Sequence, residues 1–304
     1  MEMTEIAKSL DHAASCYQAG QLSEAEQFYR NVLKINPSEA TALHRLSLIA
    51  YQTGRYDEAL KLVTEALKST PTEAVFHNTM GLILEALGRF DEAVATYSKA
   101  VALEPRYYQA HHNVAVALVA QGKYAAAAGY CEKTLSLNPG YAQAWNTMGY
   151  AFEKQGKTDE AIECYSRAIA LEPKFVEAYN HLGALLNEKH LYAQAVETLQ
   201  RALEIDPEYA EVYSNLGIAL NQLEQFDAAI ENFRHAIRLD PNFCEAHYNL
   251  ANSLRDKGQC EEAVEHYKRA IELNSDYAQA YWNLSLTLLL SGNFADGWPL
   301  YKWR

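Results

Sequence analysis

The stretch Ala142–Pro173, AQAWNTMGYAFEKQGKTDEAIECYSRAIALEP, decides the fold, because versions of it recur along nearly the whole chain. Prolines repeat every 34 residues at Pro37, Pro71, Pro105, Pro139, Pro173, Pro207 and Pro241. Glycines keep the same interval at Gly20, Gly54, Gly88, Gly122, Gly156, Gly258 and Gly292, and give way to His190 and Glu224 in between. A helix–turn–helix unit of this length cannot bury its apolar face alone, so the fixed spacing predicts stacked repeats that share one elongated core.

Each repeat is numbered here so that its proline is position 32, which starts the repeats at residues 6, 40, 74, 108, 142, 176, 210, 244 and 278. The pattern of bulky residues at positions 4, 7 and 11, a small residue at 8, alanine at 20 and 27 and an aromatic residue at 24 resembles the tetratricopeptide repeat. The fifth repeat supplies it with Trp145, Met148, Gly149, Phe152, Ala161, Tyr165 and Ala168.

The resemblance implies an all-α fold, a right-handed superhelical solenoid of antiparallel helix pairs with eight full repeats and a partial ninth. We expect a first helix over about positions 1–14 and a second over about 17–30, with glycine at position 15 closing the first helix in the left-handed conformation. Residues 6–304 then form a single array after a disordered N-terminus at 1–5. The first repeat has Ser9, His12 and Cys16 where bulky residues are expected, as a solvent-facing terminal repeat requires.

Composition excludes several classes of protein. The net charge is −13 without a cluster of Lys and Arg, which argues against binding nucleic acid phosphates. The N-terminus lacks the basic and apolar segments of a secretory signal, and no run of about 18 apolar residues predicts a membrane span. The five cysteines form no C-x-x-C pair, which favours reduced packing residues in a cytoplasmic protein.

The sequence offers no catalytic motif: there is no H-E-x-x-H, no Gly-rich phosphate loop and no nucleophile elbow. Its ten histidines recur mainly at equivalent positions of different repeats, on the order of 10 Å apart, too far to converge on one zinc ion. We therefore expect no enzyme activity, no metal and no cofactor in this chain. The basic residues of a tetratricopeptide clamp for chaperone C-termini are missing as well.

In tetratricopeptide-repeat proteins, positions 2, 6, 9 and 13 of the first helices line the concave surface. Asparagine occurs there or at the flanking position 5 in most repeats, and its amide both donates and accepts hydrogen bonds, which suits the backbone of an extended peptide. The row resembles the asparagine ladder of the O-linked N-acetylglucosamine transferases; the alternative is that these amides only bridge adjacent helices. The candidate residues are Asn78, Asn113, Asn146, Asn180, Asn215, Asn249 and Asn283.

Position 9 carries an apolar row, Leu48, Leu82 and Val116, in three consecutive repeats. Later repeats turn polar and acidic on the same surface. An exposed apolar row marks a binding surface, so we expect an apolar or amphipathic segment at repeats 2–4 and a polar or basic one beyond. The alternative is that neighbouring helices cover these residues.

The ninth repeat is apolar around most of its first helix, and Leu289, Leu290, Trp298 and Trp303 are candidates for contact with another domain or with a second copy. The segment Gly292–Arg304 is similar to the junction of bacterial proteins in which such an array leads into a glycosyltransferase-like domain. The sequence thus predicts a scaffold that binds a protein or peptide; the alternatives are the recognition arm of a larger glycosyltransferase-like enzyme and a homo-oligomeric scaffold.

Overall fold

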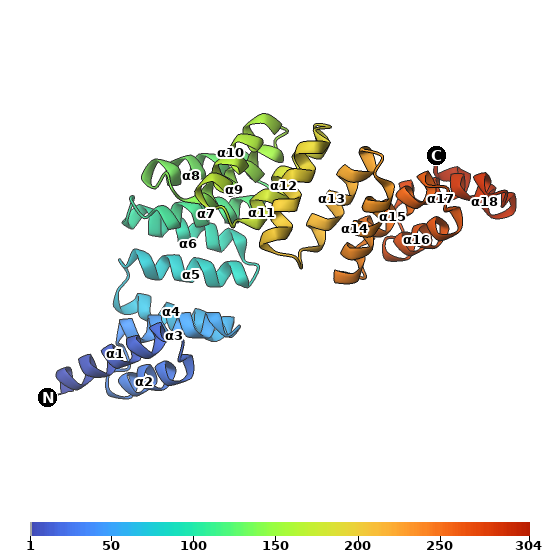
Figure 1. The fold of residues 1–304 in the computed structure, drawn as a ribbon. Coiled ribbons are helices and arrows are strands. Elements are labelled where there is room, and N and C mark those ends of the chain that lie inside the picture. The colour runs from blue at the N-terminus through green and yellow to red at the C-terminus, as the bar shows by residue number, and fades with distance from the viewer. Residues whose placement is uncertain (1) are drawn as a thin grey trace. The chain divides into compact units, whose positions relative to one another are not determined.

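The structure, a computed structural model, describes residues 2–304, with side chains from Ile6 onward. Of the disordered N-terminus expected at residues 1–5, Met1 lies outside the described residues, and residues 2–5 belong to the first helix, α1 (Glu2–Gln18). Over residues 2–304 the chain forms eighteen α-helices, one short 3-10 helix and no strand. The helices pack into two compact units, one ending at Lys157 and the other comprising Thr158–Arg304 (Figure 1).

The first unit contains repeats 1–4 and the first helix of repeat 5. Odd-numbered helices are the first helices of their repeats, and even-numbered helices are the second. The helices are α1 (Glu2–Gln18), α2 (Leu22–Ile35), α3 (Ala40–Gln52), α4 (Tyr56–Ser69), α5 (Ala74–Ala86), α6 (Phe90–Leu103), α7 (Tyr108–Ala120), α8 (Tyr124–Leu137) and α9 (Ala142–Glu153).

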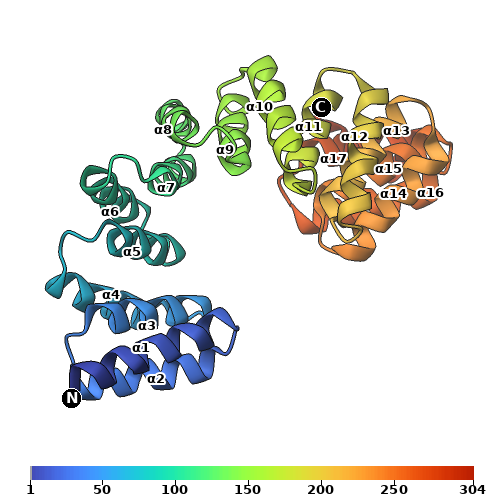
Figure 2. The ribbon, with the colours of Figure 1, turned by 60° about the vertical axis from the view of Figure 1, so that its left-hand side comes forward.

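The second unit continues the same alternation, but its ninth repeat is shortened. Its elements are α10 (Thr158–Leu171), α11 (Val176–Glu188), α12 (Tyr192–Ile205), α13 (Ala210–Gln222), α14 (Phe226–Leu239), α15 (Cys244–Asp256), α16 (Cys260–Leu273), α17 (Ala278–Leu290), α18 (Phe294–Leu300) and the 3-10 helix η1 (Tyr301–Trp303). Within each unit, successive first helices lie side by side, each packed on the second helix before it (Figures 1 and 2). The predicted all-α fold of helix pairs is confirmed.

The turn inside each repeat requires a left-handed residue at position 15. Gly54, with φ 75°, is followed by Arg55, whose N–H donates to the Ala50 carbonyl at 2.8 Å and so closes the end of α3. His190 and Glu224 adopt the same conformation, with φ of 60° and 58°. A left-handed residue with a Cβ costs roughly 1–2 kcal/mol, so the repeat packing holds these two turns against their local preference.

In most repeats the core forms where a small residue at position 8 of the first helix meets a large one at position 24 of the second. Tyr97 is fully buried over Gly81, where an added Cβ would lie 2.4 Å from its ring. Alanines at positions 20 and 27 are also fully buried, for example Ala161 and Ala168. Burying each such aromatic or aliphatic side chain contributes roughly 1.5–3 kcal/mol.

The ninth repeat closes differently because α18 contains Gly297 and Pro299. Gly297 lets α18 approach α17 closely, since a Cβ there would lie 2.8 Å from the side chain of Leu289. The chain then turns into η1, where Trp303 stacks on Tyr281 with ring centroids 4.4 Å apart.

Candidate functional site

The surface that we call the first-helix face consists of positions 2, 6, 9 and 13 of the first helices in one unit. These positions are spaced so that they fall on one side of a helix. Most of their side chains are half-buried or exposed, unlike positions 3, 8 and 10, which pack inward. The face belongs to α3, α5, α7 and α9 in the first unit and to α11, α13, α15 and α17 in the second.

Hydrogen bonds between neighbouring first helices cross this face at regular intervals. The side chain at position 5 of one repeat bonds to the side chain at position 6 of the next, and we call each such bond a rung. Asn113 Nδ2 donates to Asn78 Oδ1 at 2.9 Å, and Asn215 Nδ2 donates to Asn180 Oδ1 at 2.8 Å. The amide row therefore bridges adjacent helices at these two places, and each amide keeps further donor or acceptor capacity for another contact.

Two histidines make the remaining rungs of the first unit. His44 Nε2 lies 2.8 Å from Thr79 Oγ1, and His112 Nε2 lies 3.1 Å from Thr147 Oγ1. The Thr147 hydroxyl donates its hydrogen to the Gln143 carbonyl, so the His112 rung requires a proton on Nε2. Burial lowers the pKa of both His44 and His112 to about 4, which keeps both rings neutral at pH 7.

Among the other predicted asparagines, Asn283 makes one more rung, because its Nδ2 donates to the hydroxyl of Tyr248 at position 5 of the preceding repeat. The same Nδ2 also donates to Asn252 Oδ1, each bond being 2.9 Å long. Asn249 lines a small hollow, and Asn146 Oδ1 is buried with no hydrogen-bond partner among the described residues.

In the first unit, position 9 is an apolar row. Leu48, Leu82 and Val116 are half-buried, and Tyr150 extends the row to α9. Tyr150 was not among the predicted residues, although its repeat position alone would have identified it. Val75, at position 2 of α5, adds an apolar side chain that is 42% exposed.

In the second unit, the first-helix face is hollowed between α11, α13 and α15. One hollow of about 320 Å³ includes Ala184, Asn187, Asn215 and Ile218 in its walls. An adjoining hollow of about 80 Å³ includes Ile218, Asn249 and Asn252. Since Ile218 and Gln222 line both, the two hollows form one depression whose walls combine amide and apolar side chains.

Carboxylates border this depression. Glu177, Glu211 and Glu245 occupy position 2 of three successive repeats, are exposed, and form no ion pair among the described residues. Glu188 and Asp256 occupy position 13 at the opposite ends of α11 and α15, where Asp256 pairs with Arg255 at 2.8 Å. The face of the second unit is thus rich in amides, with exposed carboxylates at position 2 of three successive first helices.

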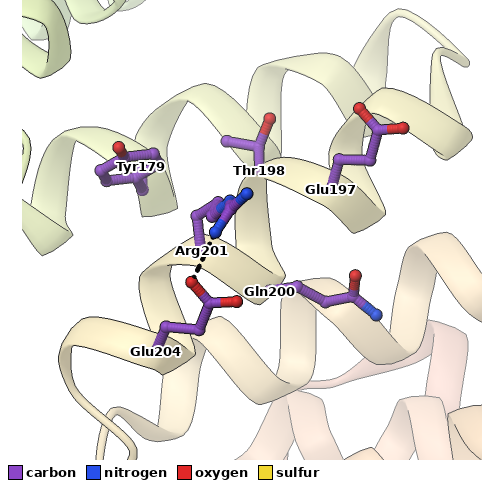
Figure 3. Close-up of a pocket in the computed structure, with 6 residues that line it drawn as sticks. All are labelled: Tyr179, Glu197, Thr198, Gln200, Arg201 and Glu204. Carbon is purple, nitrogen blue, oxygen red and sulfur yellow. Dashed lines mark hydrogen bonds and ion pairs between the residues drawn. The ribbon is translucent and has the colours of Figure 1, made fainter.

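A separate open pocket lies between α11 and α12, outside this face (Figure 3). Tyr179, Thr198 and Arg201 line it, and Arg201 Nη1 donates to Glu204 Oε2 at 2.8 Å. The next repeat has an equivalent pocket lined by Tyr213 and His235. The pocket recurs in successive repeats, and its Arg201–Glu204 ion pair is exposed. We therefore attribute the pocket to the way in which the side chain at position 4 packs against the second helix of its repeat.

Histidines and cysteines of the described residues take part in packing. At position 4, His77, His111 and His247 each contact the carbonyl of the proline that precedes their repeat, as the Trp145 indole does at 3.1 Å. Within residues 2–304 no three His, Cys, Asp or Glu side chains are placed to hold a metal ion. All five cysteines are free thiols, and burial raises the pKa of Cys164 to about 12.

The four predicted contact residues of the ninth repeat separate into two pairs. Leu289 packs beneath α18 and Trp303 stacks on Tyr281, so both contribute to the repeat itself. Leu290 and Trp298 are 72% and 59% exposed.

Fold and surface together define an all-helical repeat protein of the α-solenoid class. Models of the tetratricopeptide repeat match residues 17–83, 78–142, 130–163, 175–242 and 232–265, and a TPR repeat model matches 149–189 and 251–292. Together they cover residues 17–292 without a gap, and the chain belongs to the tetratricopeptide-repeat proteins. No curated protein sequence matches it.

Solved structures share the fold at low identity. The crystal structure of the APC/C hetero-tetramer Cut9-Hcn1 matches 88% of this chain and 52% of its own, with 19% identity and a TM-score of 0.70. This chain therefore spans about half the length of that relative. YrrB, described as a TPR protein with an unusual peptide-binding site, matches 60% of this chain and 95% of its own at 22% identity and a TM-score of 0.50. MamA matches 56% and 92% at 24% identity and a TM-score of 0.50.

Among residues 2–304, none of the helices combines the length and the apolar character that crossing a lipid bilayer needs.

Proposed function

We propose that this chain is a non-catalytic scaffold that binds an extended or helical segment of another protein on its first-helix faces. The observation that carries the proposal is the row at position 9 of the first unit. Leu48, Leu82, Val116 and Tyr150 present apolar surface on four successive first helices, and part of each side chain stays open to solvent. A contiguous apolar row on a soluble surface marks an interaction site.

The chemistry of the two faces supports different ligand segments. The first unit presents aliphatic side chains and few charges, which suits an apolar or amphipathic segment. The second presents amides edged by Glu177, Glu211 and Glu245, which suits a polar segment with basic side chains. In this proposal the ligand is a peptide or protein, with no part for nucleic acid, membrane or cofactor, and the array is continuous and cytoplasmic.

A peptide library tests the first-unit face while the natural ligand is unidentified. Random 12-residue peptides displayed on phage are selected against the full chain, and individual clones are then measured against a Leu82→Asp/Val116→Asp variant. We expect enriched clones rich in apolar residues that lose binding to the variant, because the two carboxylates would meet apolar side chains at the centre of the row.

The control variant is Ala95→Asp/Ala126→Asp, which places the same charges on exposed positions of α6 and α8 in the same repeats. It should retain binding. Clones that bind the row variant and the parent equally well would show that neighbouring helices, and not a ligand, account for the apolar row.

The exposure of Leu290 and Trp298 favours a second candidate function, in which the ninth repeat contacts a catalytic domain or a second copy. The similarity of Gly292–Arg304 to the junction of bacterial glycosyltransferase-like fusions supports the first form, the recognition arm of a larger enzyme. The mass of the native gene product tests this form: a mass well above 34.2 kDa would support an arm, and a mass equal to it would contradict one.

For self-association, the mass in solution should rise with concentration and return to one chain in a Leu290→Asp/Trp298→Asp variant.

A further inference from the structure

Glu85 is a half-buried carboxylate beside the apolar row of the first unit. It occupies position 12 of α5, one helical turn beyond Leu82, which is at position 9 in the row. Burial raises the pKa of the Glu85 carboxyl group, and only a hydrogen bond from Tyr97 opposes this shift. Among the described residues, therefore, no Lys, Arg or His lies close enough to Glu85 to compensate its charge.

One hydrogen bond fixes the position of the Glu85 side chain. Tyr97 Oη, on α6, donates to Glu85 Oε2 at 2.9 Å. Burial raises the pKa of the Tyr97 hydroxyl, so this group stays protonated and remains a donor. A carboxylate can accept about four hydrogen bonds in all, so Glu85 Oε1 keeps its acceptor capacity for another donor.

In two other repeats, the next first helix supplies a donor to the residue at position 12. Gln52 Nε2 donates to Tyr17 Oη at 2.9 Å, and Ser253 Oγ donates to Asn221 Oδ1 at 2.6 Å. These donors occupy positions 13 and 10 of the following repeat. The first helix that follows Glu85 is α7, which lies beside α5 and has alanine at both positions. Since alanine offers no side-chain donor, α7 leaves the Glu85 carboxylate without the partner that those repeats provide.

The surroundings of Glu85 favour a basic side chain of a bound segment. Leu82 precedes it by one turn, and Tyr51 of α3 is near enough that the Glu85 charge, after burial, raises the pKa of its hydroxyl. Lysine and arginine can pack their aliphatic stems along such apolar surface while their charged ends form strong hydrogen bonds to a carboxylate. An aliphatic ligand side chain would instead remove water from Glu85 without replacing its hydrogen bonds.

We propose that the segment bound on the apolar row carries one lysine or arginine among apolar residues, and that this side chain pairs with Glu85. The inference rests on the proposed function and adds a requirement to it, because Glu85 then distinguishes one class of apolar segment from the others. Tyr97 acts as a positioning residue, since its hydroxyl holds one oxygen of the carboxylate and leaves the other for the ligand.

Parallel selections test the requirement for a basic residue. The random 12-residue phage library is selected against the full chain and against Glu85→Gln, which removes the charge but keeps an oxygen to accept the Tyr97 hydrogen bond. Clones enriched on the parent should carry lysine or arginine between apolar residues several-fold more often than the starting library. Clones enriched on Glu85→Gln should lose this preference. The control is Glu132→Gln, which removes an exposed charge from α8 and should retain it.

Synthetic peptides of an enriched clone then measure the strength of the pair. Replacing the basic residue with norleucine keeps an aliphatic stem and removes the charge. This replacement should weaken binding to the parent about tenfold, because a hydrogen bond between charged groups is lost. The two peptides should bind Glu85→Gln with nearly equal affinity in isothermal titration. Circular dichroism checks that Glu85→Gln and Glu132→Gln keep the helical content of the parent.

The outcomes separate this inference from the proposed function. Enriched clones that need Leu82 and Val116 but lack a basic residue would overturn the inference and leave the proposed function intact. So would a norleucine peptide that binds the parent as tightly as the basic one, or an equal effect of norleucine on the parent and on Glu85→Gln. A selection in which no clone depends on Leu82 and Val116 would overturn both.

Discussion

At the scale of single residues, the glycines at position 8 are set by the large side chain opposite each of them. Gly183 illustrates this, because a Cβ there would lie 2.5 Å from both Cγ and Cδ2 of the fully buried Leu199. Helix propensity favours alanine over glycine by about 1 kcal/mol, but overpacking a core costs typically 1–3 kcal/mol. The close approach of α11 and α12 therefore requires glycine at this position.

We predict that Gly183→Ala lowers the free energy of unfolding by up to about 2 kcal/mol, since the clash outweighs the propensity gain. The matched control is Gly129→Ala in the exposed middle of α8, where an added Cβ meets nothing within 4 Å. That variant should be more stable than the parent by up to about 1 kcal/mol. Urea unfolding followed by circular dichroism measures both, and a Gly183→Ala protein as stable as the parent would show that Leu199 moves aside freely.

At the scale of elements, the sequence predicted the helices and their order but not the rungs between them. Helix bounds follow from positions 15 and 32, whose residues act locally on the backbone. A rung joins residues 35 apart, such as Asn78 and Asn113, and depends on how two first helices lie beside each other. Their positions within the repeat place both amides on one surface, and only the packed structure shows that they form a hydrogen bond with each other.

The histidine rungs make the junctions between first helices sensitive to acid. The pKa of His44 and His112 is about 4 in the folded chain and about 6.5 in the unfolded chain. Between these values the unfolded state binds more protons, so the free energy of unfolding falls as the pH falls from about 6.5 towards 4. Above about pH 6.5 both states are neutral and the histidines cause no pH dependence.

We predict that a His44→Asn/His112→Asn variant loses much of this decline between pH 7 and pH 5. Asparagine is the natural residue at position 5 of repeats 3, 5 and 6, so the substitution suits the local geometry. Urea midpoints at the two pH values measure the effect. Part of the decline in the urea midpoint between pH 7 and pH 5 should remain, because burial also lowers the pKa of His247 and His266. An unchanged decline would contradict its assignment to the histidine rungs.

At the scale of the whole molecule, regular repetition supports surfaces of different chemistry. The positions that pack inward are small or apolar in nearly every repeat, which is why the fold could be predicted from the period. On the first-helix face, position 2 changes from Val75 in one unit to Glu211 in the other and position 9 from Val116 to Asn252, and packing places few limits on these positions. Tyr150 and Trp303 show what the repeat pattern does not predict. A position in the repeat indicates which surface a side chain belongs to, but not which neighbouring side chain covers it.

We predict that the acidic edge of the second unit contributes to binding of basic segments. A 12-residue peptide of alternating lysine and serine should bind a Glu177→Gln/Glu211→Gln/Glu245→Gln variant about tenfold more weakly than the parent at low salt, because each exposed charge contributes up to about 1 kcal/mol. The control removes the same three charges from position 22 of repeats 6–8, as Glu197→Gln/Glu231→Gln/Glu265→Gln. Equal weakening of both variants in isothermal titration would mean that only net charge matters.

The rungs of the first unit also determine how the array can be shortened. His–Thr rungs alternate with an Asn–Asn rung, so the chemistry of the junctions repeats every two helix pairs. Excising residues 74–141 would place His44 beside Thr147, which has the same hydroxyl as its present partner Thr79, whereas excising 74–107 would place His44 beside Asn113, whose longer amide must fit the space of that hydroxyl. Duplication or loss of repeats in this part of the chain should therefore be tolerated best in pairs, which makes the pair of repeats, and not the single repeat, the interchangeable module.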